Sequence, residues 1–383
     1  MATSNFKVSI IPRPNVSLRG FFSRGKSFPL GKRNYFSSGR VALSAILSSI
    51  RSKKNGSQVL VPSYVCSVVL DACRWSGLTP VSYSVNEDLT VDLVDVQEKL
   101  SDSVVALVAV HFFGKLAELD SLSEACKDAG IPMIEDAAHL DIDNQEDDFW
   151  KCRKGSWIFS SLRKFSGTFD GAIAVPLSPE SAQSLAGADH RLLAELRGLK
   201  NNFEILRGPG PVVQGSSNET EQFEEKGVKA ESASVHQHSV QSEYVDSRFK
   251  LDSANAMTWS SRVVARLNNR SCAGLRRSEI FCAVRDASTE WDRARLLFQE
   301  LEQGSVPYVI PVLLNDSDAD YHEIRQAGVE ALRWENLGDT GCRVCVLYER
   351  RLIQIPCHEQ MSNKDVDFLI DTLRGILVND CKR

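Results

Sequence analysis

The feature that most constrains the fold of this chain is a regular alternation of two kinds of segment between residues 40 and 136. Short apolar runs typical of strands occur at 58–62, 81–85, 104–110 and 132–136. Segments with apolar residues at helical spacing, which we predict as helices, occur at 40–53, 65–75, 92–100 and 119–129. Gly77 and Gly130 follow two of these helices, where glycine is the usual C-terminal cap. Strands that alternate with helices form a mostly parallel sheet covered on both faces, so we expect an α/β fold.

The rest of the chain suggests a second, smaller α/β unit. Further strands are predicted at 157–161, 306–314, 342–348 and 351–356, and further helices at 253–267, 322–332 and 364–377. Residues 207–246 are polar and rich in Gly, Ser and Glu, which predicts a long loop or a disordered insert. We therefore divide the chain into an N-terminal arm at 1–36, a large domain at 37–245 that contains the insert, and a smaller domain at 247–383.

Composition and charge argue against several classes of protein. The 383 residues are 43% hydrophobic and 25% charged, which is ordinary for a soluble globular protein. The net charge of −5 is spread along the chain, so we expect no nucleic-acid partner. The longest apolar run, at 104–110, is too short to cross a membrane, and the N-terminal segment has too short an apolar core for a signal peptide. The 10 cysteines are irregularly spaced and favour a reducing compartment, so we expect a cytoplasmic protein without a membrane partner.

Polar residues gather where the predicted strands end. His111 follows one strand, and Asp136 ends the next. Ser160 and Ser161 end a third strand, and Lys164 lies at its junction with the following turn. In a parallel sheet the carboxyl ends of the strands share one edge, where functional groups collect. We therefore expect these side chains to form one site.

A candidate phosphate-binding element opens the first predicted helix at Ser37, Ser38 and Gly39. Free N–H groups at a helix N-terminus suit a phosphate, although Ser and Gly are also ordinary helix caps. A phosphate cradle, a strand-end Asp and a nearby Lys match the needs of pyridoxal 5′-phosphate (PLP). Its aldehyde forms a Schiff base with a lysine, and its pyridinium nitrogen pairs with a carboxylate. By spacing alone, structural roles stay equally open, and Asp136 could instead cap a helix.

Longer stretches of the chain resemble a known family. They are SSGRVAL at 37–43, VLVPSYVCSVV at 59–69, GLTPVSYSVNEDLTVD at 77–92, VALVAVHFFGKLAELDSL at 105–122, IPMIEDAAHLD at 131–141, FSSLRKFSGTFDGAIAV at 159–175 and LIQIPCHEQMSNKDVDFLI at 352–370. In this order they resemble the DegT/DnrJ/StrS family of sugar aminotransferases, which are fold-type I PLP enzymes. The resemblance covers most of 35–175 and about 245–378. It implies a large domain with a mostly parallel seven-stranded sheet between helices, and a smaller C-terminal α/β domain.

The resemblance also implies a role for each residue that matches the family's motifs. Lys164 would form the Schiff base and act as the base in the 1,3-proton shift, and Asp136 would pair with the pyridinium nitrogen. His139 would lie beside the cofactor ring and its 3-oxygen, and His111 would lie under the ring. The cofactor phosphate would be held by Ser38, Gly39 and either Ser160 or Ser161.

Two further expected cofactor contacts depart from the family's pattern. Cys66 stands where many members place an aromatic ring against the cofactor, and the nearest ring in the sequence is Tyr64. Arg40 replaces the usual small residue after the phosphate-turn glycine, where it could contact the phosphate or block the turn. The stretch 176–245, which bears on substrate choice, matches the family poorly.

The resemblance implies a PLP-dependent aminotransferase. It would move an amino group from glutamate or glutamine to a nucleotide-linked keto-sugar, in the biosynthesis of a polysaccharide, a cell-surface glycan or a natural product. The family forms homodimers whose active sites use both chains. Two alternatives stay open, namely a PLP enzyme of another reaction type and a PLP-fold protein that has lost catalysis and acts as a binding or assembly partner. Lys164 argues against dehydration, because the dehydrating members replace this lysine.

A metal site is a further possibility at Cys342, Cys345, Cys357 and His358. We predict a strand at 342–348, in which the first two cysteines would point to opposite faces. A fourth ligand would then be missing. We therefore expect these residues to pack in the core and to bind no metal.

Overall fold

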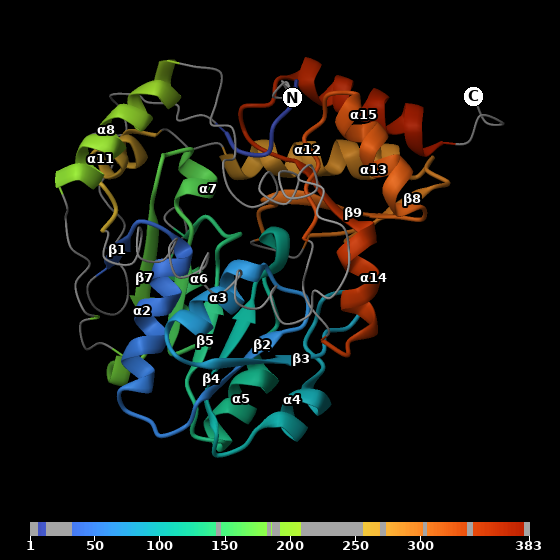
Figure 1. The fold of residues 1–383 in the computed structure, drawn as a ribbon. Helices are drawn as coiled ribbons and strands as arrows, with labels where there is room; N and C mark the ends of the chain where they lie inside the picture. Colours follow the sequence, from blue (N-terminus) through green and yellow to red (C-terminus); the bar gives the residue numbers. More distant parts are fainter. Residues whose placement is uncertain are drawn as a thin grey trace, which may run out of the picture.

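The structure is a computed structural model that describes residues 7–12, 33–142, 147–181, 185, 192–207, 256–268, 273–301, 305–334 and 340–378. These residues form two β-sheets, and the smaller one lies with its helices at the upper right of Figure 1. The predicted insert, from residue 208 onward, and the predicted domain boundary near residue 245 lie outside the described residues. Within the described ranges, no helix combines the length and apolar character needed to cross a membrane.

The larger sheet has seven strands in the order β1-β7-β6-β5-β4-β2-β3. Their bounds are β1 Asn34–Phe36, β2 Gln58–Pro62, β3 Thr79–Tyr83, β4 Val104–Val110, β5 Met133–Asp136, β6 Trp157–Ser160 and β7 Ala172–Pro176. Strands β3, β2, β4, β5 and β6 run parallel, whereas β7 and β1 are added antiparallel at one edge. The predicted mostly parallel seven-stranded sheet is therefore confirmed. All residues of the interior strand β4 are buried, as its unbroken apolar sequence requires.

Helices connect the parallel strands and cover the sheet (Figure 1). They are α2 Gly39–Arg51, α3 Ser67–Trp75, α4 Leu93–Lys99, α5 Asp120–Asp128, α6 Asp147–Lys151 and α7 Arg163–Ser166, followed by α8 Leu192–Arg207 and α11 Trp259–Leu267, which pack against each other. Gly77 and Gly130 adopt the left-handed conformation, with φ of 70° and 64°, directly after α3 and α5. The glycine caps read from the sequence thus end the helices where expected.

The smaller sheet is antiparallel, in the order β10-β9-β8. Its strands are β8 Ala294–Leu296, β9 Val309–Leu314 and β10 Leu352–Pro356, and its helices are α12 Ala273–Ser288, α13 Ser317–Gln326 and α15 Asn363–Leu377. The helix predicted at 322–332 begins earlier and ends at Gln326, because the chain turns at Gly328 with a φ of 101°. This sheet has a hydrophobic core of its own, between the strands and the three helices.

The segment predicted as a C-terminal strand is instead helix α14 (Arg343–Arg351), so that prediction is wrong. Cys342, Cys345 and Tyr348 recur every three residues, which is the spacing of a helix face, and all three are buried. Alternation along a strand would instead have buried Val346, which is 61% exposed. The two cysteines therefore share one face of α14 and do not point to opposite sides.

Helix α14 ties the smaller sheet to the larger one. The thiols of its two buried cysteines donate hydrogen bonds to the carbonyls of Val85 and Ser63, at 3.8 and 3.0 Å. The Tyr348 hydroxyl donates to the carbonyl of Glu87 at 2.5 Å. These acceptors lie just beyond the carboxyl ends of β2 and β3, so α14 docks at the same sheet edge where the polar residues were expected.

The N-terminal segment 7–12 makes a second connection. Val8 packs in the core of the smaller sheet, whereas Ile10 and Ile11 pack in the core of the larger one. The backbone N–H of Ile10 also donates to the buried carboxylate of Glu330 at 2.6 Å. This short segment therefore bridges the two cores.

Candidate active site

A cavity of ≈ 320 Å³ lies beyond the carboxyl ends of β4, β5 and β6, and its volume is in the range of small-ligand sites. Of the residues predicted to form the site, those that line it are Ser38, Gly39, Arg40, Cys66, His111, Asp136, His139, Ser161 and Lys164. They come from five different segments of the chain. The shared edge of the parallel strands brings them together, as the order of strands and helices predicts.

The end of the cavity formed by the start of α2 is suited to an anion. Ser38 caps the helix, and its hydroxyl accepts a hydrogen bond from the N–H of Val41 at 3.4 Å. The first turn of α2 contains no acidic residue, so its N-terminal N–H groups keep their positive partial charge. The buried hydroxyl of Ser37 has no hydrogen-bond partner in the described part of the chain. A ligand oxygen at this position would satisfy it.

Gly39 adds no side chain at this end of the cavity. A Cβ added at Gly39 would lie 3.7 Å from the Phe159 ring and 3.9 Å from the Cβ of Ser161, in the space between them. Ser161 lines the cavity, whereas the hydroxyl of Ser160 donates to the carbonyl of Leu140 at 2.9 Å and is not among the lining groups. Of the two serines that the sequence left open, the structure therefore brings Ser161 to the cavity and turns Ser160 away.

Asp136 ends β5 at the floor of the cavity and is 5% exposed. One carboxylate oxygen accepts a hydrogen bond from the N–H of Ala138 at 2.9 Å. Burial raises the pKa of Asp136, and that hydrogen bond and the charge of Lys164 oppose the shift. The alternative of a helix N-cap is wrong, since the chain makes a turn after Asp136 and no helix. Within the described residues, the second oxygen accepts no hydrogen bond and is available to a ligand.

Lys164 lies in α7, a single helical turn, and not at the end of a strand as predicted. Its Nζ lies 5.3 Å from the centre of the Tyr308 ring, and the described residues offer it no hydrogen-bond acceptor. Burial lowers the pKa of Lys164, and the neighbouring Arg163 acts in the same direction, whereas Cys66 and Asp136 oppose the shift. The site therefore makes the neutral amine, which is the nucleophilic form, easier to reach than it is for a lysine in water.

His139 is held between two aromatic rings at the cavity wall. Its ring is stacked on Tyr308 at 4.7 Å and on Phe113 at 5.6 Å between ring centres. Its Nδ1 accepts a hydrogen bond from the N–H of Phe113 at 3.1 Å, so the proton of the neutral ring lies on Nε2. Burial lowers the pKa of His139 well below its ordinary value. Phe113 has a φ of 57°, which is unusual outside glycine and aims its N–H at the histidine.

The aromatic ring nearest to Cys66 in sequence does not reach the cavity. Cys66 precedes α3 and lines the cavity, and burial raises the pKa of its thiol. Tyr64 is fully buried and packs against Trp334, with 5.0 Å between ring centres. Trp334, far along the chain, lines the cavity instead. The sequence carries no sign of this contact, because only the docking of the smaller unit brings Trp334 there.

Another wall joins α8 and α11 to the turn after α7, and sequence analysis did not predict it. The Asp170 carboxylate accepts hydrogen bonds from the N–H of Thr258 at 3.0 Å and from its hydroxyl at 2.9 Å. Both residues line the cavity, together with Ala194 and Arg197 of α8. An Asp-Gly pair at 170–171 predicts a turn, but its partner 88 residues later cannot be read from local pattern.

Residues 35–140 match the model of the DegT/DnrJ/EryC1/StrS aminotransferase family. GDP-perosamine synthase of Vibrio cholerae is 31% identical over 103 residues, which are 27% of this chain and 28% of that protein. The chain thus matches little more than a quarter of the length of this curated relative. The region that matches the family model contains the start of α2, His111, Asp136 and His139, and ends before Lys164.

Solved structures extend the likeness to nearly the whole chain. PseC of Helicobacter pylori, an aminotransferase involved in the biosynthesis of pseudoaminic acid, superposes with a TM-score of 0.64 at 13% identity, over 91% of this chain and 88% of that one. A DegT/DnrJ/EryC1/StrS aminotransferase of Brucella abortus gives a TM-score of 0.62 at 16% identity, over 91% and 87%. At such identities the likeness establishes the fold, and it confirms the predicted one. Residues 35–140 thus carry the sequence pattern of the DegT/DnrJ/EryC1/StrS aminotransferases, and the chain has the fold of sugar aminotransferases of that family.

Proposed function

We propose that this protein is a PLP-dependent aminotransferase that moves an amino group from glutamate or glutamine to a nucleotide-linked keto-sugar. The observation that carries the proposal is the meeting of the Lys164 amine, the Asp136 carboxylate and the N-terminus of α2 in one cavity. The relatives support the reaction class, since a perosamine synthase and a pseudoaminic acid aminotransferase both act in sugar biosynthesis. A cytoplasmic location is part of the proposal, as the cysteine content favours it.

The residues of the cavity fit PLP. When bound, PLP supplies an electron sink for the transfer of the amino group. Lys164 would hold the cofactor through its amine and, once released, carry a proton on Nζ. Asp136 would accept a hydrogen bond from the ring nitrogen of PLP. His139 would donate a hydrogen bond from Nε2 to the 3-oxygen of PLP. The anionic end would be held by the start of α2 with the hydroxyls of Ser37 and Ser161.

We also infer a homodimer, on the evidence of an exposed apolar surface beside the cavity. Leu192, Leu196, Leu199, Phe203 and Leu206 are 47–75% exposed and form the apolar ridge of α8. Trp259 and Val263, 60% and 50% exposed, extend it onto α11 (upper left of Figure 1). Such a contiguous surface is typical of a protein interface. Because α8 also lines the cavity, a second copy on this ridge would lie next to the site.

A visible absorption spectrum of the protein with added PLP tests the function. We expect a band that bleaches when glutamate or glutamine is added, and a Lys164→Ala variant that never gives the native band. Keto-sugar nucleotides would then be screened for restoration of the band after bleaching. A band that ignores both amino donors would contradict an aminotransferase, and the absence of any band would contradict PLP binding.

A further inference from the structure

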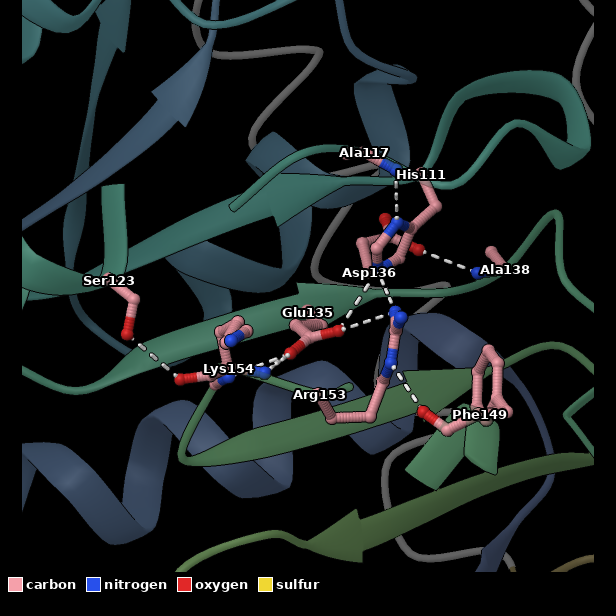
Figure 2. Close-up of polar contacts among 10 residues, drawn as sticks. His111, Ala117, Ser123, Glu135, Asp136, Ala138, Phe149, Arg153 and Lys154 are labelled. Atoms are coloured by element: carbon pink, nitrogen blue, oxygen red, sulfur yellow. Dashed lines mark hydrogen bonds and ion pairs between the residues drawn. The ribbon is translucent and has the colours of Figure 1, made fainter. Parts of the chain in front are cut away.

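We propose that Glu135 and Arg153 are positioning residues that hold the His111 ring in a single tautomer at the floor of the cavity (Figure 2). The inference rests on the proposed function, because the ring is positioned for the bound cofactor. The two residues lie behind the cavity and touch no ligand in it, since neither lines it. They act through His111, which does.

The hydrogen bonds of His111 fix its proton. The ring is fully buried, and its backbone N–H donates to the carbonyl of Asp136 at 3.0 Å. Nδ1 accepts a hydrogen bond from the N–H of Ala117 at 3.0 Å, so it carries no proton. Nε2 therefore carries the proton and donates it to a carboxylate oxygen of Glu135 at 3.0 Å. With both nitrogens engaged, the ring is neutral and cannot turn over.

Glu135 is the centre of the network and is itself fully buried. One of its oxygens accepts hydrogen bonds from the N–H groups of Lys154 and Gly155, both at 2.7 Å. The other accepts from His111 and from Nη1 of Arg153 at 3.1 Å. Burial alone would raise the pKa of Glu135, but the hydrogen bond from His111 and the charge of Arg153 lower the pKa below its ordinary value. The carboxylate is therefore ionised.

Arg153 supplies the matching charge from a fixed position. Its side chain is 6% exposed, Nε donates to the carbonyl of Phe149 at 3.1 Å, and the guanidinium lies 4.4 Å above the Phe149 ring. Nη1 is also 3.3 Å from Nε2 of His111. Both of these nitrogens are donors, so they converge on the same oxygen of Glu135 and do not bond each other.

The loop that carries Arg153 is built to approach Glu135 closely. A Cβ at Gly155 would lie 3.0 Å from Cγ of Glu135 and 3.0 Å from the carbonyl of Trp157, so a larger residue would push the loop away. Lys154 pairs with Asp120 at 2.6 Å on the exposed side. The close approach at Gly155 and the ion pair of Lys154 hold the loop in place. They explain how Arg153 keeps its position beside Glu135.

The network adds no net charge on the cavity side of β5. Glu135 and Asp136 are adjacent in the strand, so their side chains point to opposite faces. The charge of Glu135 is balanced by Arg153, and His111 stays neutral. Asp136 thus faces the cavity with no imidazolium beside it to compete for its carboxylate. This arrangement keeps Asp136 available to a cationic ring nitrogen.

Two variants and one matched control test the inference. Glu135→Gln turns an amide NH₂ toward groups that are all donors, and Arg153→Met leaves the Glu135 carboxylate without its balancing charge. Lys154→Met removes a charge from the same loop but keeps the backbone N–H. Nitrogen-15 NMR of the histidine side chains in the protein without PLP, with His111 assigned by a His111→Gln variant, reports the tautomer. Titration with PLP reports the dissociation constant.

We expect the Nε2-protonated form in the native protein and in Lys154→Met, with the same PLP affinity. In Glu135→Gln and Arg153→Met we expect a shifted or averaged His111 signal and roughly tenfold weaker PLP binding, because a buried charge-assisted hydrogen bond is lost. Arg153→Lys keeps the charge and should recover part of the affinity. It also serves as the test if the stronger substitutions unfold the chain, which circular dichroism would reveal.

A native His111 protonated on Nδ1 would overturn the inference. So would variants that keep both the native signal and the native PLP affinity. These outcomes differ from a failure of the proposed function, in which the native protein shows the predicted tautomer but does not bind PLP.

Discussion

At the scale of single residues, burial acts in opposite directions on the two central groups of the cavity. It lowers the pKa of Lys164 and raises that of Asp136, and the charge of each opposes the shift of the other. Both groups have few protein partners, since Asp136 accepts one backbone hydrogen bond and the described residues give Lys164 no acceptor. The unfilled hydrogen-bonding capacity of both groups faces the cavity, where a ligand would complete it.

The Asp136→Asn variant separates the effect of the Asp136 carboxylate on stability from its effect on catalysis. Asn keeps the hydrogen bond from Ala138, so the fold is retained. Because the folded state raises the pKa of Asp136, the ionised carboxylate opposes folding above its ordinary pKa of 3.8. We expect the PLP-free variant to be at least as stable as the native protein near neutral pH, and transamination to fall on the order of 10²-fold. Thermal melts measure the stability, and turnover of the amino donor measures transamination. Unchanged turnover would remove Asp136 from the proposed mechanism.

Ser160 and Ser161 offer a matched pair of substitutions. Ser161→Ala removes a hydroxyl that lines the cavity, so PLP affinity should fall roughly tenfold at nearly unchanged stability. Ser160→Ala removes the hydrogen bond to Leu140, so stability should fall by about 1 kcal/mol at unchanged PLP affinity. PLP titration and urea unfolding of both variants are the measurements. The reverse pattern would mean that Ser160 holds the cofactor.

Sequence analysis found site residues that the order of the elements brings together, and it missed residues that only long-range docking brings to the cavity. His111, Asp136 and Ser161 follow strands of one parallel sheet, so the order of the elements is enough to bring them together. Trp334 and Thr258 also line the cavity, but they reach it through the docking of the smaller unit and of α11. Such long-range contacts leave no local pattern to read.

At the scale of elements, α14 shows where pattern reading fails. Its N-cap and first residues, Cys-Arg-Val-Cys-Val-Leu-Tyr at 342–348, include valine and tyrosine and suggest a strand. Burial at Cys342, Cys345 and Tyr348 follows a spacing of three, and that side packs on the carboxyl ends of β2 and β3. Tertiary packing of this face outweighs the local preference. By contrast, helices with clear caps, such as α2 and α15, begin within one residue of the predicted position.

The buried ring of His358, which contacts the N-terminal segment 7–12, should make stability depend on pH. His358 donates from Nε2 to the carbonyl of Ser9 at 2.9 Å, and its Nδ1 accepts from the N–H of Gln360 at 3.3 Å. Burial lowers the pKa of His358 from 6.5 to about 4, with Arg277 acting in the same direction. The folded state thus favours the neutral ring, so its contribution is complete above the ordinary pKa and is lost as the pH falls toward the lowered one.

Urea unfolding of the PLP-free protein at about pH 7 and about pH 4.5 measures this loss. We expect stability to fall by up to roughly 3 kcal/mol on account of His358. His358→Gln should reduce the fall without abolishing it, because His139 is also buried with a lowered pKa and titrates in the same direction. Equal losses in the variant and the native protein would exclude His358 as a source of the pH dependence.

At the scale of the whole molecule, the apolar ridge of α8 bears on how the active site is completed. Helix α8 is held to α11 by close packing, since a Cβ at Gly198 would lie 2.7 Å from the Thr258 side chain. One side of this pair lines the cavity, and another presents the exposed leucines and Trp259 to solvent. A second copy that covered the ridge would fix α8, and with it the cavity wall that contains Arg197. Assembly and activity should therefore be lost together.

Leu199→Glu combined with Phe203→Glu tests this coupling. The two side chains are 61% and 52% exposed, so the substitutions cost little within one chain but place charges in the proposed interface. We expect the native protein to be a dimer by light scattering and the double variant to be a monomer with at least roughly tenfold lower turnover. Val94→Glu on α4, at a site 65% exposed and away from the ridge, is the matched control and should stay dimeric and active. A native monomer with full turnover would show that one chain completes the site alone, and a dimeric double variant would place the interface elsewhere.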